Sequence, residues 1–408
     1  MHILIIGTVR PAHQKALEMG HEISLIIDKK NVRPSDVNVS YRKIMMMEAD
    51  ASIQEYQAVA DAIHQHSPVD AICCFNDTAQ EHAIAVAEKL KLPFSIDLAT
   101  LDVLYNKQKT RALLHAKGLD DTQFREVTSV DDITDFFREV NAPIIVKPFD
   151  STGSSGIIRI KSAADINQEM QRFFDAKHTF PAIAEEFLQG KEYSVEAFSE
   201  NGEHVILGIT EKLKDKETFI ENGHAFPASI SLRDKENIES FVRDMLSVVG
   251  IKNGLSHTEV MLTEKGPKLI ESHSRAGGDR IFKLIELVTG IDVFEIQIRQ
   301  TLGEKVLTEV QDAVNAIEGK AAAIRFLSLG FDTNTKLVSI DNIEAAQAVE
   351  GVVEVMPMKE AGSTMGVVTD SFARTVWAVA KADSPERALE QADKSLQTLK
   401  INLNWEMQ

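Results

Sequence analysis

Residues 257–280, "HTEVMLTEKGPKLIESHSRAGGDR", have the pattern of a β-hairpin, in which two short apolar runs flank a turn centred on Lys265. Each run carries a glutamate, and this centre places Glu259 opposite Glu271. Opposed residues of a hairpin have Cβ atoms about 5 Å apart, and like charges in such positions destabilise the sheet. The two carboxylates therefore need an explanation beyond strand pairing.

The hairpin alone leaves three interpretations of this pair open. The carboxylates could be solvated or salt-bridged, could share a proton as an acid/base pair, or could bind a divalent metal. Carboxylate oxygens suit Mg²⁺, whose shell is often completed by substrate phosphates. His257 and His273 pair on the same face, but a zinc site would need three or four nitrogen or sulfur ligands. The alternate face carries Thr258, Val260, Leu262 and Ile270.

The composition indicates an acidic globular chain with more than one core. Its 408 residues suggest two to four folded units, and 62 acidic against 44 basic residues give a net charge of −18. Such acidity argues against general binding to nucleic acids or anionic membranes. No run approaches the roughly 20 apolar residues of a membrane helix, and residues 3–6 are too short for a signal-peptide core. Cys73 and Cys74 are adjacent and read as buried hydrophobes, so we expect a reducing, cytoplasmic setting.

The first hundred residues alternate strand and helix patterns, which predicts a parallel, doubly wound sheet. Two capping boxes mark helix starts: Ser52 with Glu55, and Thr78 with Glu81. A dinucleotide site is disfavoured, because "GTVRPA" retains only Gly7 of the G-x-G-x-x-G phosphate fingerprint. Asp28 ends the second strand and reads as a turn residue.

Beyond residue 100 the patterns mix helices with strand-rich stretches, typical of an α+β arrangement. Helices are predicted for "NKQKTRALLHAKG" and for residues 133–140, 236–250, 282–289 and from 293 onward. Asn201-Gly202 is an apt hairpin turn. From Lys320 short strands follow, and the helix "SPERALEQADKSLQTLK" comes last.

A small, hydroxyl-rich loop follows an apolar strand that ends in Lys147. The loop, residues 151–156, lacks the Walker A pattern, but its free N–H groups can fold over phosphates. Lys107 offers a second cation. Taken singly, the loop could be a mobile surface hairpin, and Lys107 reads as a solvated helix lysine.

Four segments in this order resemble the ATP-grasp carboxylate–amine ligases, and most of all the bacterial L-amino-acid ligases, which make dipeptides. They are "NK…R" (Lys107 and Arg111), "IIVKPFDSTGSSG", "EEFLQGKEYSVE" and "TEVMLTEKGPKLIESHSRAGGD". The resemblance implies an ATP-grasp fold with an N-terminal doubly wound parallel-sheet domain and a C-terminal strand-rich part. It divides the chain at 1–100, 101–182 (with the phosphate loop), 183–315 (with the metal hairpin) and 316–408.

The resemblance also implies the cofactors and their sites. ATP phosphorylates a carboxylate, and an amine then attacks the acyl phosphate to give an amide, ADP and phosphate. Glu259 and Glu271 match the carboxylates that hold Mg²⁺, with Mn²⁺ as an alternative. The nucleotide site would comprise the phosphate lysines and loop, the adenine hinge and the ribose glutamate: Lys107, Lys147, Ser154, Ser155, Gly156, Glu185, Glu186, Leu188 and Glu192.

The substrate residues implied by the resemblance lie in two segments. Arg275 would face the substrate carboxylate and the acyl phosphate, since its planar fork suits both groups. Glu221 would bind the ammonium of the first amino acid, and His224 would contact the transferring group or orient or deprotonate the attacking amine. Gly277 and Gly278 would let the backbone pass close to the substrate. His273 stands where many ATP-grasp enzymes have asparagine, and we do not assign it as a metal ligand.

Other functions remain open at this stage. Another ATP-grasp ligase or carboxylase, acting on a different small carboxylate, would use the same nucleotide residues. A nucleotide-binding regulator with a degenerate site is disfavoured, because both phosphate lysines and both metal glutamates are present. The expected partners are small-molecule amino acids and a second copy in a homodimer, with no nucleic acid and no membrane. The net acidity favours a cationic amino acid only slightly, because bulk charge says little about one pocket.

Overall fold

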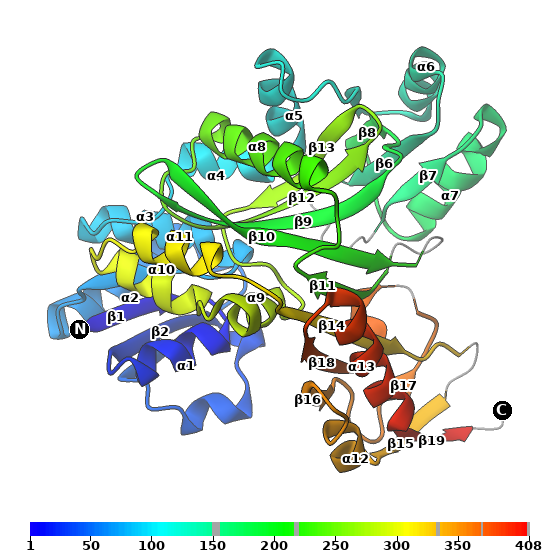
Figure 1. Cartoon of the computed structure of the whole chain (residues 1–408). Coiled ribbons are helices and arrows are strands. Elements are labelled where there is room, and N and C mark those ends of the chain that lie inside the picture. Colours follow the sequence, from blue (N-terminus) through cyan, green and yellow to red (C-terminus); the bar gives the residue numbers. More distant parts are fainter. Residues whose placement is uncertain (149–155, 216–219, 332–334, 369, 406–408) are drawn as a thin grey trace.

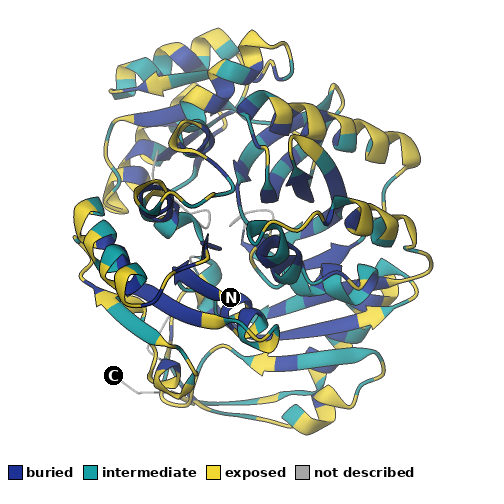
Figure 2. Ribbon diagram, turned by 90° about the vertical axis from the view of Figure 1, so that its left-hand side faces the viewer, coloured by how far each residue is buried: buried dark blue, intermediate teal, exposed yellow. Residues whose placement is uncertain are grey.

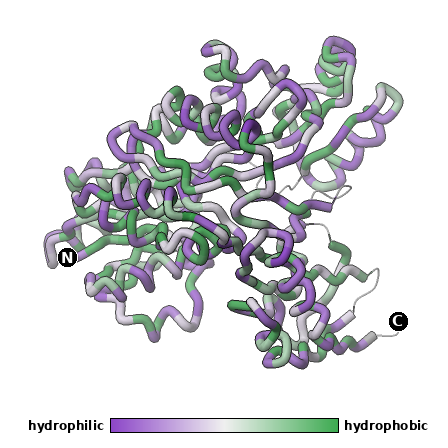
Figure 3. Tube along the Cα trace, in the orientation of Figure 1, coloured by the Kyte–Doolittle hydropathy of each residue, from purple (hydrophilic) through white to green (hydrophobic). Residues whose placement is uncertain are grey.

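The computed structural model describes residues 1–148, 156–215, 220–331, 335–368 and 370–405. Its N-terminal part is a parallel sheet with the strand order β3-β2-β1-β4 (Figure 1). The strands are β1 (His2–Ile6), β2 (Glu22–Asp28), β3 (Lys43–Met47) and β4 (Ala71–Cys73), and the helices are α1 (Arg10–Glu18), α2 (Ile53–His66) and α3 (Gln80–Leu90). Every residue of β1 is buried, because helices cover both faces of the sheet. Figure 3 shows the matching hydrophobic stretch near the N-terminus, and the predicted doubly wound sheet is confirmed.

Only one of the two predicted capping boxes forms. Ser52 and Glu55 cap α2 reciprocally, as predicted. The prediction for Thr78 and Glu81 was wrong, because α3 begins at Gln80 without a side-chain cap, after a 3₁₀ turn over Asp77–Ala79. Thr78 instead accepts a hydrogen bond from Asn76 Nδ2 at 2.9 Å.

A second, smaller sheet is antiparallel, with the order β5-β8-β6-β7. Its strands are β5 (Phe124–Val127), β6 (Ile144–Pro148), β7 (Ile158–Ile160) and β8 (Ala182–Glu186), and the nearby helices are α4 (Leu98–Tyr105), α5 (Lys107–Ala116), α6 (Val130–Val140) and α7 (Ile166–Asp175). Apolar residues of α6 and α7 pack on this sheet in one core. Since β8 pairs with both β5 and β6, it lies in this sheet, although the predicted division after residue 182 would leave only Ala182 of this strand in the same part.

The central element is an eight-stranded sheet with the order β13-β12-β9-β10-β11-β14-β18-β16. Its strands are β9 (Lys191–Glu200), β10 (Glu203–Lys214), β11 (Glu221–Phe226), β12 (Gly254–Thr263), β13 (Gly266–His273), β14 (Ala321–Ser328), β16 (Val352–Pro357) and β18 (Arg374–Ala382). Helix α8 (Leu232–Val249) covers one face of it. Helices α9 (Ile281–Thr289), α10 (Val293–Thr301) and α11 (Leu307–Asn315) lie between this sheet and the N-terminal part (Figure 1). Figure 2 shows the strands mostly buried and the outer helices exposing one face.

The β12–β13 hairpin has the predicted pairing at its far end and a different one near its turn. Glu259 pairs with Glu271, and His257 with His273. A register shift follows Glu259, so that Thr263 pairs with Gly266 and the turn is centred between residues 264 and 265. The bulge also places Leu269 opposite Val260, where a symmetric hairpin would have placed Ile270.

The C-terminal part is joined to the central sheet and is not a separate appendage. β14, β16 and β18 are strands of that sheet, and α13 (Pro385–Thr398) packs on β14 and β18. The remaining elements are a three-stranded sheet of β17 (Thr364–Met365), β15 (Thr335–Asp341) and β19 (Lys400–Trp405), and helix α12 (Ile343–Gln347). Among the described residues, no helix combines the length and apolarity needed to cross a membrane.

Candidate active site

One face of the central sheet carries charged side chains on five adjacent strands. They come from β13 (Glu271, His273), β12 (His257, Glu259), β9 (Glu192, Glu196), β10 (Lys212, Lys214) and β11 (Glu221, His224). The opposite face packs against α8 through Val195, Val260 and Leu269. The strand alternation therefore gathers the charges on one side, which we call the charged face.

Lys212 occupies the centre of this charged face. Its Nζ lies 2.9 Å from Glu192 and 2.8 Å from Glu221, and it also contacts Glu259. Burial opposes the charge of Lys212, but the three carboxylates outweigh it and raise its pKa well above the ordinary value. Sequence reasoning missed Lys212. The available signal was its alternation with Lys214, which puts two ammonium groups on one face of a strand.

The carboxylate of Glu259 is backed by a histidine and a second carboxylate. Glu196 Oε1 lies 2.5 Å from His257 Nδ1, and His257 Nε2 lies 3.4 Å from Glu259 Oε1. Burial disfavours the charged imidazole, but Glu196 and Glu259 raise the pKa of His257 to about 9. The other oxygen of Glu196 accepts a hydrogen bond from the backbone N–H of Gly277 at 3.0 Å.

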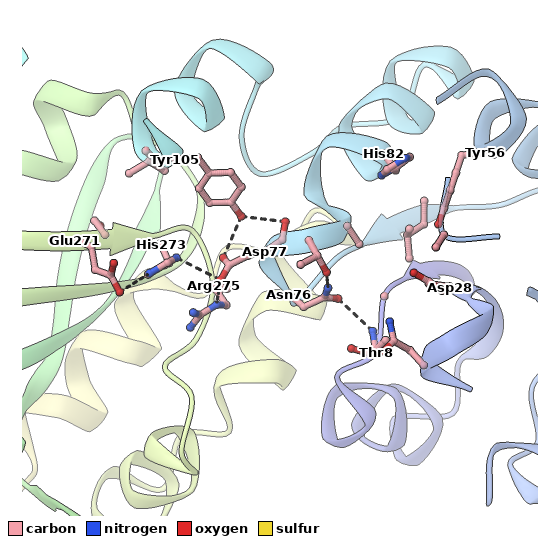
Figure 4. Close-up of a pocket in the computed structure, with 18 of the residues that line it drawn as sticks. Thr8, Asp28, Tyr56, Asn76, Asp77, His82, Tyr105, Glu271, His273 and Arg275 are labelled. Carbon is pink, nitrogen blue, oxygen red and sulfur yellow. Dashed lines mark hydrogen bonds and ion pairs between the residues drawn. The ribbon is translucent and has the colours of Figure 1, made fainter. Parts of the chain in front are cut away.

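Glu271 has an equivalent arrangement, drawn in Figure 4. His273 Nε2 lies 3.3 Å from Glu271, and His273 Nδ1 lies 3.3 Å from Asp77 Oδ2 in the N-terminal part. The same Asp77 oxygen accepts a hydrogen bond from Arg275 Nε at 2.7 Å. The Tyr105 hydroxyl lies 3.0 Å from Asp77 Oδ1. His273 therefore bridges two carboxylates, which accounts for a histidine at this position.

These charges set the pKa of Glu271 and bring Lys107 to it. Burial would raise the pKa of Glu271, but His273 and Lys107 lower it to about 2, against the opposing effect of Glu259. Lys107 Nζ lies 3.6 Å from Glu271 Oε2. The structure thus brings Lys107, from one predicted segment, to Glu271 and Arg275, which come from another.

A second cluster joins the predicted substrate residues to the C-terminal part. His224 Nε2 lies 3.1 Å from Asp279 Oδ2 and 3.9 Å from Glu221 Oε2. Arg374 of β18 completes the cluster, 2.7 Å from Asp279 and 3.3 Å from Glu221, with its guanidinium stacked 3.9 Å from the centre of the Phe326 ring. The side chain of Arg374 is only 2% exposed. Neither Asp279 nor Arg374 was predicted from sequence.

The predicted nucleotide residues are only partly brought together. Lys147 Nζ lies 2.6 Å from Glu185, whose carboxylate also accepts a hydrogen bond from Arg111 Nε at 2.9 Å. Burial opposes ionisation of Glu185, but these two cations lower its pKa to about 2. The carboxylate of Glu185 is thus already engaged, whereas that of Glu186 makes no ion pair within the described residues and is raised in pKa by burial.

Three of the other predicted nucleotide residues can be placed in the structure, and two cannot. Glu192 contacts Lys212 and Lys214 on the charged face, and Leu188 follows β8 as a half-buried residue. Gly156 has a φ of +73°, and a Cβ there would approach His178 Nε2 to 2.3 Å. Ser154 and Ser155 lie outside the described residues.

The oxygen-rich clusters fit a hard divalent cation. Glu192, Glu221 and Glu259 bring one oxygen each within 4.8 Å of one another, and Glu221, His224 and Asp279 form a similar group. Such oxygens are the ligands that Mg²⁺ prefers. In this structure the ammonium group of Lys212 neutralises part of the negative charge of the first group. A bound cation would share that neutralisation. Of the predicted pair, Glu259 belongs to this group, and Glu271 pairs with it across the hairpin as one further, half-buried carboxylate.

Beside Glu271 and Arg275 a cavity of about 940 Å³ opens toward the N-terminal part. Its walls include the loops that follow β1 and β4, together with residues of β2 and α2. Tyr105, Lys107 and Arg111 line it from α4 and α5. Glu221 and His224 do not line it, which separates this cavity from the second cluster.

Comparisons with known proteins agree with this geometry. Residues 140–283 match the ATP-grasp domain, and residues 330–404 match the L-amino acid ligase C-terminal domain 2. An uncharacterized protein of Sinorhizobium fredii is 26% identical over 80% of this chain and 67% of its own length. Alanine–anticapsin ligase of Bacillus subtilis is 27% identical over 47% of this chain, and the match spans about 45% of that enzyme.

The fold is shared with a solved ligase over nearly the whole chain. The L-amino acid ligase from Bacillus licheniformis superposes with a TM-score of 0.85 at 20% identity, covering 98% of both chains. Biotin carboxylase from Campylobacter jejuni also shares the fold, with a TM-score of 0.73 at 15% identity, covering 98% of this chain and 92% of that one. The chain therefore carries an ATP-grasp domain and the L-amino acid ligase C-terminal domain 2, and it shares its fold with a solved L-amino acid ligase.

Proposed function

We propose that the protein joins two L-amino acids into a dipeptide, with conversion of ATP to ADP and phosphate. The observation that carries this proposal is the placement of Arg275 beside Glu271, in a chain with an L-amino acid ligase C-terminal domain. Glu221, His224 and Asp279 form a separate cluster, in which an ammonium group would share Glu221 with Lys212 and Arg374. Arg275 would thus meet the carboxylate of an amino acid, and the cluster at Glu221 would meet its ammonium group.

The reaction takes two steps. A carboxylate oxygen of the first amino acid attacks the γ-phosphorus of ATP, and the bond to the bridging oxygen breaks to release ADP. The amine of the second amino acid then attacks the carbonyl carbon of the acyl phosphate. The C–O bond to phosphate breaks, the amine proton passes to phosphate or solvent, and an amide remains. Water must be kept out, because it would hydrolyse the acyl phosphate.

In this reaction Arg275 orients the carboxylate that becomes activated. Asp77 holds its Nε, and Nη1 donates to the Ala276 carbonyl at 2.8 Å, so the guanidinium plane is fixed beside the cavity. A planar fork held in this way suits the two oxygens of a carboxylate or a phosphoryl group. Fixing it beforehand lowers the reorganisation needed in the transition state.

Glu221 would receive the ammonium of the first amino acid, and His224 would set the direction of Glu221. His224 is 1% exposed and turns its Nε2 toward Asp279, while its buried Nδ1 has no hydrogen-bond partner among the described residues. This burial favours the orienting role over direct proton abstraction from the second amine. Gly277 supplies backbone near the substrate, with its N–H held by Glu196, and Gly278 follows it.

The nucleotide would lie along the charged face and the smaller sheet. Lys107 and Lys147 would neutralise phosphate charge, together with the loop that ends at Gly156. Glu186 and Leu188 would meet the adenine, and Glu192 the ribose. Glu259 and Glu271 would hold Mg²⁺ (or Mn²⁺), which supplies charge neutralisation at the phosphates.

A second candidate is an ATP-grasp ligase or carboxylase acting on another small carboxylate. The fold that the chain shares with a biotin carboxylase is the observation that favours this candidate. It differs from the first candidate in its substrate, and the nucleotide residues would be the same.

A screen of amino-acid pairs for ADP and phosphate release, with mass identification of the product, tests the proposal. We expect release only when amino acids are present, and a dipeptide as the product. Release with bicarbonate alone, or without any amino acid, would contradict the dipeptide function.

Glu271→Gln tests the metal role within the same assay. We expect turnover to fall by about 10²-fold or more, because a charge-stabilising group next to the transferring phosphoryl is lost. Glu264→Gln is the matched control, since Glu264 is an exposed residue in the turn of the same hairpin. Equal activity of the two variants would remove Glu271 from the site.

A further inference from the structure

The cavity beside Arg275 has two chemically different ends (Figure 4). One end holds Glu271, His273 and Arg275, where the acyl phosphate would form. The far end lies in the N-terminal part and is lined by Asp28, Tyr56 and His82. Polar residues from the loops after β1 and β4 connect the two ends: Thr8, Asn76 and Thr78.

The far end lies where parallel sheets bind ligands. Asp28 ends β2, Gly7 follows β1, and Asn76 follows β4, so the carboxyl ends of neighbouring strands meet there. The order β3-β2-β1-β4 reverses direction at β1, and crevices outside such switch points are common binding sites. A Cβ on Gly7 would lie 1.8 Å from Asn76 Oδ1, so glycine is needed for Asn76 to reach across and accept from the N–H of Thr8 at 3.1 Å.

The walls of the far end combine an apolar channel with an aromatic and acidic tip. Ile6, Ile26 and Ala51 are apolar lining residues of this end, and Ile6 and Ile26 are buried while Ala51 is half-buried. The rings of Tyr56 and His82 stack with centroids 4.1 Å apart. Tyr56 and Asp28 both line this end (Figure 4), where burial and the negative charge of Asp28 raise the pKa of Tyr56.

Lys30 is the cation of this end among the described lining residues, and Asp28 pairs with it at 3.1 Å. The side chain of Lys30 is 67% exposed, and exposed ion pairs contribute little. A ligand cation that entered through the channel would meet Asp28 from a less exposed side and displace Lys30. An acidic side chain would find no unpaired cation among these residues.

We propose that the far end is the side-chain subsite of the second, amine-donating amino acid, and that it takes a long basic side chain. The inference rests on the proposed ligase function. The methylenes would lie along Ala49 and Ala51, which line the cavity and are not buried, and the cation beside Asp28 at the edge of the stacked Tyr56 and His82 rings, an arrangement that combines an ion pair with a cation–π contact. The ammonium of the first amino acid is assigned to Glu221, which does not line the cavity, so this end is left to the second amino acid.

The volume of the cavity agrees with a long side chain. About 940 Å³ is near the upper end of the roughly 300–1,000 Å³ of ligand pockets. A small second amino acid such as glycine would leave the far end empty. A phosphorylated nucleotide would fill only the part near Lys107, because the far end offers no arrangement of cations for phosphates.

The test compares second amino acids with the first one fixed. Lysine, norleucine, phenylalanine and glutamate are supplied to the wild-type enzyme, and kcat/KM is measured for each. Norleucine has the apolar stem of lysine without its charge. We expect lysine to exceed norleucine by about tenfold, the size of a partly desolvated charge contact. A preference for glutamate, or for phenylalanine over lysine, would overturn the proposal.

Two variants should move this selectivity in opposite directions. Asp28→Asn keeps an oxygen for the N–H of Lys30, which Asp28 caps at 3.0 Å, but removes the charge. It should lower kcat/KM for lysine about tenfold toward the norleucine value and leave norleucine unchanged. Lys30→Gln frees Asp28 and should lower the KM for lysine. Asp61→Asn is the matched control, since Asp61 pairs with Lys89 in the same part of the chain and does not line the cavity.

Calorimetric binding of lysine and norleucine without ATP separates this inference from the ligase function. Lysine-selective binding that is lost in Asp28→Asn supports the subsite even if no dipeptide forms, and that result would defeat the ligase proposal alone. Dipeptide formation with equal effects of Asp28→Asn on lysine and norleucine would defeat the subsite alone.

Discussion

At the scale of single residues, the two opposed glutamates are explained by the groups behind them. Each is backed by a histidine that joins it to a second carboxylate, the buried Glu196 behind Glu259 and the half-buried Asp77 behind Glu271. Each distal carboxylate also holds the chain segment that carries Arg275: Glu196 binds the Gly277 N–H, and Asp77 binds Arg275 Nε. Hydrogen-bonded partners of this kind orient metal-site groups, and their loss commonly costs 10–100-fold.

We therefore predict that Asp77→Asn lowers kcat by about 10–100-fold while the KM for ATP changes little. The asparagine keeps the size of the side chain but loses the charge that fixes Arg275 and His273. Asp77 is a positioning residue, so the split between kcat and KM is the informative readout. The matched control is Asp102→Asn, because Asp102 pairs with Lys109 on the exposed side of α4. An unchanged kcat in Asp77→Asn would show that Arg275 is held without Asp77.

At the scale of elements, strand alternation predicted the hairpin and failed where the chain departs from it. The pairs at Glu259 and His257 follow from a symmetric turn and are present. The shift after Glu259 pairs Val260 with Leu269 in place of Ile270, and a one-residue bulge has no periodic signature from which it could be predicted. The predicted cap at Thr78 failed for a similar local reason, because Asn76 engages the hydroxyl and a 3₁₀ turn precedes the helix.

The fold class could be predicted from the sequence because it depends on local periodicity. The sequence motifs also allowed Lys107, Glu271 and Arg275 to be predicted as site residues. The groups that hold them were not accessible. Asp77 binds Arg275 across 198 residues of sequence, and Arg374 binds Glu221 across 153. Such contacts follow from how sheets and loops assemble, and a single sequence carries no periodic signal for them.

The segment after β13 provides an element-scale prediction with an internal control. A Cβ on Gly277 would lie 2.9 Å from Glu196 Oε1 and 2.9 Å from His257 Nδ1, whereas a Cβ on Gly278 would meet no atom within 4 Å. Gly277→Ala should therefore force the Glu196–His257 pair apart and destabilise the protein by about 1–3 kcal/mol. Gly278→Ala should change the stability by about 0.5 kcal/mol or less. Thermal unfolding measures both, and equal effects would contradict the close packing at Gly277.

At the scale of the whole molecule, three parts of the chain meet in one site. The N-terminal part supplies Asp77, the charged face of the central sheet supplies the glutamates and Lys212, and the C-terminal part supplies Arg374. Arg374 reaches the cluster because β18 is a strand of the central sheet, adjacent to β14. The match to the L-amino acid ligase C-terminal domain 2 spans residues 330–404 and therefore includes this arginine. The C-terminal part thus completes the cluster of Glu221, His224 and Asp279.

Arg374→Lys tests whether this contribution serves the first amino acid. Lysine keeps the charge, but it cannot reproduce the guanidinium fork that contacts Asp279, Glu221 and Ser371 together. We predict that the KM for the first amino acid rises about 10-fold or more, because Glu221 loses its fixed direction, while the KM for ATP stays within about twofold. Arg325→Lys on β14 is the control, since Arg325 pairs with Asp393 away from the cluster. Circular dichroism and thermal unfolding establish that each variant is folded. A rise in the KM for ATP equal to that for the amino acid would indicate a general structural role, and it would remove Arg374 from the substrate site.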